Sequence, residues 1–259
     1  LALPEDMLSR ETAATPRARV ERPAQAPCPD AMQAMMALIG DAAAPLAIIG
    51  GAGWNARARA HFQVFAERLG LPVATAFRRQ DAISPSSKVY AGNLGYGPNP
   101  RLVERVKQAD LILAIGARLG EATTDGYTVP PPTAPDRRLV HVHPDADELN
   151  RVYPADLAIC ASMDEFAESA ALWDDGAVVD FDAGAEAHRE WEEWATAHPN
   201  DHRLDMGQAV QFMRDTLPAD TIICNGAGNF AGWWHRYWRY EGFPTQLAPT
   251  CGAMGYGVP

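Results

Sequence analysis

Short apolar runs and amphipathic segments alternate along the middle of this chain. Continuous apolar runs at residues 46–49, 72–75, 110–115, 139–142 and 157–160 predict strands that are buried on both faces. Amphipathic segments at residues 55–69 and 101–108 predict helices between them. The first of these helices carries its apolar face at Phe62, Phe65, Ala66 and Leu69, and Gly70 follows it as a C-cap. Strands alternating with helices predict a doubly wound α/β domain with a mostly parallel sheet.

The beginning of the chain has a different pattern. Residues 1–4 are predicted to be the remnant of a strand, and the prolines spread over residues 16–29 predict an extended linker. Asp30 is the expected N-cap of a helix whose buried face holds Met32, Met35, Met36 and Ile39.

A second α/β unit is predicted to begin near residue 173. An acidic helix over residues 185–197 carries Trp191 and Trp194 on one apolar stripe, and Asp205 is the expected N-cap of a helix over residues 206–217. Strands at residues 221–224 and 245–248 each run into a glycine-rich turn. The predicted organisation is therefore a strand end and linker at 1–29, a Rossmann-like domain at 30–172 and an incomplete α/β unit at 173–259.

Composition adds limits on partners. The chain of 259 residues is 47% hydrophobic and 21% charged, as expected for a globular protein, and no apolar run has the length of a membrane span. A net charge of −11 argues against nucleic acid as a partner. The 4 cysteines lie far apart with no CxxC pair, which predicts reduced, buried thiols in a cytoplasmic protein. The chain starts at Leu1 and stops at Pro259, where a helix should begin, so we expect a piece of a longer protein.

The turn after the first predicted strand is rich in glycine. Residues 51–56, Gly-Ala-Gly-Trp-Asn-Ala, have the spacing of a dinucleotide-binding turn between a strand and a helix. The acid that would bind a ribose hydroxyl is missing from the end of the next strand, at residues 74–77. This pattern favours a tight strand-to-helix turn over an NAD site. A nucleotide phosphate near Gly50, Gly51, Gly116 and Arg118 stays open as an alternative.

Three further clusters have simpler explanations than a functional site. His141 and His143 point to one side of a strand, but no third ligand has the spacing of a zinc site, so no metal site is predicted. The acids at residues 145–148 suit the start of a helix. The aromatic and basic residues over 230–240 could stack on nucleic acid, yet the acidic chain favours packing against a neighbouring domain or subunit.

The two glycine-rich turns near the end of the chain come as a pair. Residues 225–229, Asn-Gly-Ala-Gly-Asn, and residues 251–257 each follow a predicted strand of one sheet, so both are expected to line one crevice at its edge. The first turn can present backbone N–H groups to an anion. The second places Met254 between glycines, where its thioether can lie against a flat ring. The pair indicates a ligand in which a diphosphate is joined to a heteroaromatic ring.

Over nearly its whole length the chain resembles the thiamine-diphosphate-dependent enzymes of the acetolactate synthase type. Residues 109–118, Ala-Asp-Leu-Ile-Leu-Ala-Ile-Gly-Ala-Arg, are similar to a stretch of that family's central domain. Residues 252–259, Gly-Ala-Met-Gly-Tyr-Gly-Val-Pro, are similar to the segment that opens the main helix of its diphosphate-binding domain. Residues 1–7 resemble the last strand of its pyrimidine-binding domain.

The resemblance implies a cofactor site and a reaction. Gly252 would offer its carbonyl to the cofactor's 4′-amino group, and Met254 would hold the cofactor in its bent shape. The implied cofactor-binding residues are Gly228, Asn229, Phe230, Gly252, Ala253 and Met254. The activated cofactor would attack a 2-oxo acid, release CO₂ and pass the remaining carbanion to an acceptor or a proton, which is lyase or transferase chemistry.

The chain departs from the family pattern at several positions. Phe230 stands where the diphosphate turn commonly has a histidine, while His141 and residues 119–122 replace groups that flavin-binding members use, which argues against FAD. The glutamate that activates the cofactor and the ligands of Mg²⁺ would lie before Leu1 and after Pro259. The resemblance therefore predicts no catalytic residue and no metal ligand within this sequence, and no turnover by it alone. It also implies a homodimer or homotetramer.

Two other interpretations stay open. A nucleotide-binding module could use the turn at residues 50–53 to hold NAD, ADP or FAD, or the middle domain could serve only as a spacer between its neighbours. The identity of the 2-oxo acid and of the acceptor is not specified by the sequence.

Overall fold

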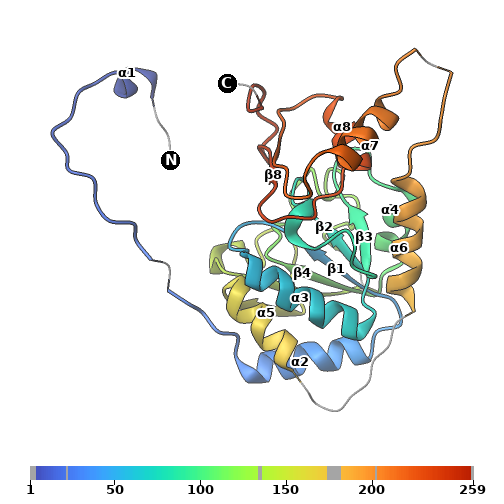
Figure 1. Ribbon diagram of the computed structural model, residues 1–259. Coiled ribbons are helices and arrows are strands. Elements are labelled where there is room, and N and C mark those ends of the chain that lie inside the picture. The colour runs from blue at the N-terminus through green and yellow to red at the C-terminus, as the bar shows by residue number, and fades with distance from the viewer. Residues whose placement is uncertain (1–3, 22, 134–135, 174–181, 202, 258–259) are drawn as a thin grey trace.

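A computed structural model describes residues 4–21, 23–133, 136–173, 182–201 and 203–257. The chain is built around a 6-stranded sheet in the order β3-β2-β1-β4-β5-β6 (Figure 1). These strands are β1 (Pro45–Ile49), β2 (Val73–Thr75), β3 (Tyr90–Asn93), β4 (Leu111–Ile115), β5 (Arg138–His143) and β6 (Leu157–Cys160). Every neighbouring pair is parallel. The predicted doubly wound α/β fold is confirmed.

The centre of the sheet is buried because its strands are continuously apolar. Every residue of β1 and β4 is buried, and the two strands run in register from Pro45 opposite Leu111 to Ile49 opposite Ile115. The chain winds in opposite directions from these two strands. The turns after β1 and β4 therefore leave the sheet at the point where ligands commonly bind in such folds.

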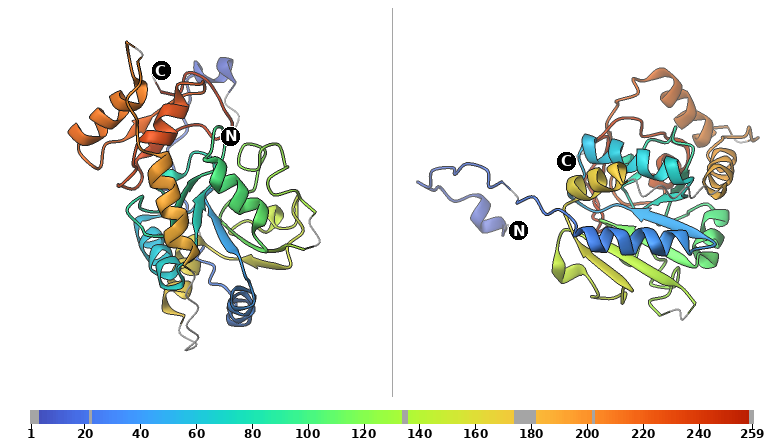
Figure 2. Two further views of the ribbon diagram at one scale, coloured as in Figure 1. Left: turned by 90° about the vertical axis from the view of Figure 1, so that its right-hand side faces the viewer. Right: turned by 90° about the horizontal axis from the view of Figure 1, so that it is seen from below.

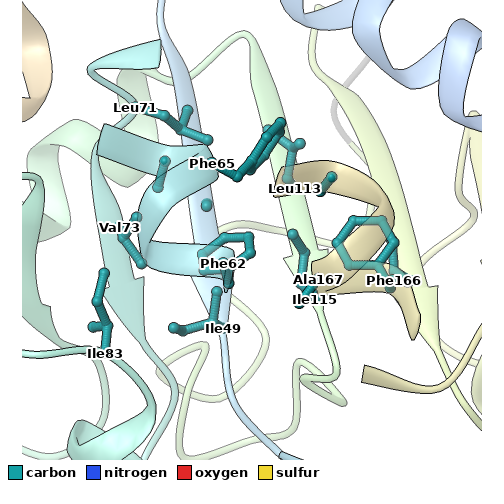
Figure 3. Packing of buried hydrophobic residues seen from close by; sticks show 14 of the residues in the cluster. Ile49, Phe62, Phe65, Leu71, Val73, Ile83, Leu113, Ile115, Phe166 and Ala167 are labelled. Carbon is teal, nitrogen blue, oxygen red and sulfur yellow. The ribbon is translucent and has the colours of Figure 1, made fainter. Parts of the chain in front are cut away.

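Helices cover both faces of this sheet (Figures 1 and 2). They are α2 (Pro29–Gly40), α3 (Ala56–Leu69) and α5 (Met163–Leu172) on one face and α4 (Pro100–Gln108) on the other. Figure 3 shows Phe62 and Phe65 from α3 and Phe166 from α5 lying over Ile49 and Ile115. Each side chain buried in this way contributes about 1.5–3 kcal/mol to folding.

Local capping explains where several helices begin and end. Asn55 accepts a hydrogen bond of 2.8 Å from the Ala58 amide at the start of α3, and Gly70 ends that helix in the left-handed conformation, as the sequence predicts. At the start of α2 the prediction is wrong, because Cys28 and not Asp30 is the N-cap. Pro29 has no N–H to lose at the first helical position, so the helix begins before Asp30.

The last part of the chain adds α6 (Ala183–Trp194), α7 (Met206–Thr216), α8 (Ala231–Tyr237) and a 2-stranded parallel sheet of β7 (Ile223–Cys224) and β8 (Gln246–Leu247). Asp205 caps α7 by accepting from Gln208, as predicted. Helix α6 covers the outer strand of the large sheet, with Trp191 against Tyr90 at 4.7 Å between ring centroids. The smaller sheet and α8 lie against the end of the large sheet (Figure 1).

The beginning of the chain contributes little to the core. Of the predicted strand at residues 1–4, residues 1–3 lie outside the described part, and Pro4 precedes a short helix, α1 (Glu5–Leu8). The linker that follows is exposed and reaches away from the body (Figure 2). No helix among the described residues is long and apolar enough to cross a membrane.

The cysteines are free, as predicted, but the prediction that they are buried is wrong. Cys28, Cys224 and Cys251 are exposed and Cys160 is half-buried. Cys28 lies at the end of the linker and Cys251 in a surface loop. Cys224 lies in a sheet of only 2 strands, which leaves one of its faces to solvent.

Candidate functional site

The two glycine-rich turns predicted to form a site lie directly against each other. Strands β7 and β8 are parallel, with Ile223 opposite Gln246, so both turns leave the same end of this sheet. A Cβ atom added to Gly226 would lie 3.3 Å from the Gly255 amide nitrogen, and one added to Gly257 would lie 3.1 Å from the Cys224 carbonyl oxygen. The two backbones can approach this closely because glycine occupies these positions.

The first turn presents backbone donors that have no acceptor. No described residue accepts a hydrogen bond from the amides of Ala227, Gly228 or Asn229. Gly228 adopts φ 137°, which a residue with a side chain rarely reaches, and Gly228, Asn229 and Phe230 are all exposed. A turn with several free N–H groups at the surface can bind an anion such as a phosphate.

The second turn holds an exposed methionine between glycines in left-handed conformations. Gly252 and Gly255 have φ values of 77° and 81°, and a Cβ atom added to either would meet nothing within 4 Å. Backbone conformation rather than crowding therefore favours glycine here. The side chain of Met254 is 85% exposed, and Ala253 beside it is exposed as well. The loop thus offers a flexible thioether close to the free amides of the first turn.

A buried arginine that the sequence analysis did not single out joins the first turn to the segment that enters the second. Arg78 follows β2, and its guanidinium donates to the carbonyl oxygen of Gly226 at 3.0 Å and to that of Pro249. Burial lowers the pKa of Arg78 below its usual value, because the charged form loses solvation.

The residues after Arg78 hold the smaller sheet in place. The carboxylate of Asp81 is buried and accepts from the amides of Thr245 and Gln246 at 3.1 and 3.2 Å. Gln80 forms two hydrogen bonds with the Gln246 side chain. Its backbone N–H donates to the Gln246 side-chain oxygen at 2.6 Å, and its own side-chain oxygen accepts from the Gln246 side-chain nitrogen at 3.0 Å. Four polar residues that begin three positions after a buried strand, at the sheet edge where ligands bind, were the signal that could have identified this segment.

Of the residues predicted as a nucleotide alternative, Gly51 and Arg118 line a cleft of about 370 Å³, whereas Gly50 and Gly116 do not line it. Gly51, Arg79 and Arg118 line it from the large sheet, and Gly252 lines it from the second turn. Arg118 is mostly exposed and pairs with Glu148 at 3.2 Å. The cleft therefore joins the two predicted sites at the end of the large sheet.

Close packing of the backbone explains why glycine occupies the positions of that alternative nucleotide site. A Cβ atom on Gly51 would lie 1.8 Å from the Gly116 carbonyl oxygen, and one on Gly116 would lie 2.6 Å from the Gly50 carbonyl oxygen. The turns after β1 and β4 pass so closely that no side chain fits between them. The glycine spacing is explained by this packing, and a nucleotide site stays a prediction.

None of the described histidines belongs to a group of residues that could hold a metal ion. His141 bonds the Ala117 carbonyl at 2.9 Å, and burial lowers its pKa. The rings of His141 and His143 lie 6.0 Å apart, and the described residues include no group of three or more His, Cys, Asp or Glu that could hold a metal ion. His235 is buried beside Phe77, and burial lowers its pKa to about 4, so it is neutral at pH 7.

The aromatic segment packs, but three of its buried rings lie in the core of their own unit, where the sequence predicted packing against a neighbouring domain or subunit. Tyr237, Trp238 and Tyr240 are buried in the core of the last unit together with Val210 and Ile223. Burial also raises the pKa of the Tyr240 hydroxyl above its usual range.

Comparison with known proteins identifies the large sheet. The family model described as "Thiamine pyrophosphate enzyme, central domain" matches residues 32–169, the range that holds all six strands of this sheet.

Several characterised sequences are similar to the chain over most of its length. The acetolactate synthase large subunit of Corynebacterium glutamicum is 27% identical over 92% of this chain and 39% of its own length. The sulfoacetaldehyde acetyltransferase of Rhodobacter capsulatus is 27% identical over 99% of this chain and 48% of its own length. The acetolactate synthase isozyme 2 large subunit of Escherichia coli is 24% identical over 86% of this chain and 40% of its own length. The chain thus spans less than half of the length of these relatives.

Proposed function

Because the chain belongs to the thiamine pyrophosphate enzyme family through its central domain, we propose that it forms part of a thiamine-diphosphate-dependent lyase or transferase that acts on a 2-oxo acid. The observation that carries this proposal is the direct contact between the two glycine-rich turns at one end of the smaller sheet. Their amides and their exposed methionine supply the two kinds of contact that a diphosphate joined to a heteroaromatic ring requires.

The donor set fits the organic part of this cofactor. The free amides of Gly228 and Asn229, with the backbone of Phe230, would hold the diphosphate. Gly252 and Ala253 would bring backbone groups against the pyrimidine, and Met254 would lie against the rings. When bound, the cofactor supplies a carbon nucleophile for 2-oxo acids, and the residues of this chain orient it.

We propose that the metal and the acid–base group come from parts of the protein outside these residues. The described part of the chain has no cluster that could ligate Mg²⁺. Residues 1–259 alone are therefore expected to bind the cofactor weakly and to show no turnover. The relatives carry two different enzyme names, so the acceptor is left open. We further propose that the protein works in the cytoplasm as a homodimer or homotetramer.

Isothermal titration of thiamine diphosphate with Mg²⁺ into the full-length protein tests the proposal. A saturable heat is expected, and Met254→Asp is expected to weaken binding at least tenfold, which corresponds to about 1.4 kcal/mol. Val64→Asp, an exposed position on α3, serves as the control for added negative charge. No saturable heat, or equal binding by both variants and the parent, would contradict the proposed site.

A nucleotide site in the 370 Å³ cleft is the second candidate, and the position of Arg79 and Arg118 on its wall favours it. It predicts that ADP, NAD or FAD binds this chain and that Arg118→Ala weakens the binding several-fold. Absence of binding by all three nucleotides would leave the spacer interpretation for the central domain.

A further inference from the structure

We propose that Arg78 is a positioning residue that holds the first cofactor turn at a fixed spacing from the segment entering the second turn, and that keeps the Ala227 amide facing outward. No sequence motif discussed above contains Arg78. The inference rests on the proposed function for the purpose of the turns, but the positioning itself is a property of this chain and can be measured without the cofactor.

The side chain of Arg78 is held in a buried position between the turns. The residue is 4% exposed, and its guanidinium donates to the carbonyl of Gly226 in the first turn and to that of Pro249, two residues before the second turn. Gly226 and Pro249 are far apart in sequence. Gly226 comes shortly after the short strand β7, and Pro249 comes shortly after the short strand β8. A single planar group with donors on a rigid fork therefore bridges the two segments, in addition to the bond of 3.1 Å from the Asn225 amide to Leu247.

The backbone of Arg78 supports this role. Its φ of 59° lies in the left-handed region, which is unfavourable for a residue with a side chain. Such conformations persist where the surrounding structure imposes them, and they concentrate at functional sites. Arg78 thus combines a left-handed backbone with a side chain that lies between the central domain and the last unit.

The charge of Arg78 has no carboxylate partner among the described residues. Its guanidinium lies 4.8 Å from the centre of the Phe77 ring, and its Nε atom is buried without an acceptor. A buried cation is costly unless it is well bonded, so the two carbonyl groups are its main compensation. Displacing either segment would leave this cation with only one of its two carbonyl partners, which couples both segments to the central sheet.

Peptide geometry links these bonds to the free amides. The C=O and N–H groups of a trans peptide point in opposite directions. Because the Gly226 carbonyl points at Arg78, the N–H of Ala227 points away from it, and no described residue accepts from that N–H. The same relation holds between the Pro249 carbonyl and the Thr250 amide. Arg78 thereby keeps the Ala227 amide of the first turn facing away from it, while the Pro249 carbonyl also accepts from the Gly252 amide of the second turn at 3.2 Å.

Arg59 provides a matched control in the same structure. It also lies in the central domain, its guanidinium donates to the Glu241 carbonyl at 2.9 Å, and burial lowers its pKa as it does for Arg78. Glu241 precedes β8 and belongs to neither turn. Arg59→Gln therefore removes a similar bond between the same two parts of the chain and leaves both turns untouched.

Hydrogen exchange of this chain, measured by mass spectrometry without cofactor, tests the inference. In Arg78→Gln, exchange in segments 225–230 and 249–257 is expected to accelerate at least tenfold together at their hydrogen-bonded amides, those of Asn225 (to Leu247, 3.1 Å) and Gly252 (to Pro249, 3.2 Å), because two bonds to a charged donor are lost. Arg59→Gln should leave both segments unchanged. Arg78→Lys keeps the charge but not the fork, so it should accelerate at least one segment. Circular dichroism checks that each variant is folded, and if Arg78→Gln is not, Arg78→Lys decides.

A second measurement separates this inference from the proposed function. In the full-length protein, Arg78→Gln is expected to weaken thiamine diphosphate binding about tenfold or more while Arg59→Gln does not. If the parent protein binds no thiamine diphosphate, the proposed function fails and the exchange data alone decide the role of Arg78. Unchanged exchange of both turns in a folded Arg78 variant, or equal acceleration in Arg59→Gln, would overturn the inference.

Discussion

Replacing Gly51 by alanine tests whether the glycine-rich turn after β1 is explained by packing. Gly51 has φ 72°, and an added Cβ atom would lie 1.8 Å from the Gly116 carbonyl oxygen. The backbone conformation alone costs alanine about 1–2 kcal/mol. The overlap with a backbone oxygen cannot be relieved by a side-chain rotation, so the ends of β1 and β4 must separate, at about 1–3 kcal/mol more. We expect Gly51→Ala to lower the free energy of unfolding by roughly 2–5 kcal/mol.

Gly97→Ala isolates the conformational part of this effect. Gly97 has a similar φ of 69°, but its added Cβ atom would meet nothing within 4 Å. Urea unfolding followed by tryptophan fluorescence gives both free energies, and Gly97→Ala should lose only about 1–2 kcal/mol. If Gly51→Ala loses no more than Gly97→Ala, the packing explanation of the turn is wrong, and the glycines would need another reason, such as a bound phosphate.

Two further predictions concern the core and its response to acid. Phe62→Ala, at a fully buried position on α3, should lower the free energy of unfolding by about 3–5 kcal/mol in urea, whereas Val64→Ala, 53% exposed on the same helix, should change it by less than about 1 kcal/mol. His235 has a folded-state pKa of about 4 because it is buried, so the unfolded chain takes up a proton first as the pH falls below about 6.5. The free energy of unfolding should therefore fall by up to roughly 3 kcal/mol as the pH is lowered from about 6.5 to about 4. His235→Phe should lack this part of the pH dependence. An identical pH dependence in the parent and the variant would refute its assignment to His235.

The sequence predicts those parts of the fold that a local pattern encodes. The continuous apolar runs locate β1, β4 and β5 to within one or two residues, and the caps at Asn55, Gly70 and Asp205 follow from side-chain and backbone chemistry. The strand β3 was not predicted, because its residues Tyr-Ala-Gly-Asn include a glycine and lack an apolar run. Its stability comes from tertiary packing, since α6 covers it and Trp191 fills the space above Gly92.

The contact between the two glycine-rich turns was predictable because each turn follows a strand and the strands are parallel neighbours. The residue that joins the turns was not, since nothing in the local sequence shows that the side chain of Arg78 reaches carbonyls well over a hundred positions away. Cofactor motifs name the groups that would touch the ligand, whereas the spacing of those groups depends on residues with no motif of their own. In this chain the polar segment after β2, from Arg78 to Asp81, connects the central sheet to both turns. A change in the central domain can therefore alter the turns without touching them, and the comparison of Arg78→Gln with Arg59→Gln measures that effect.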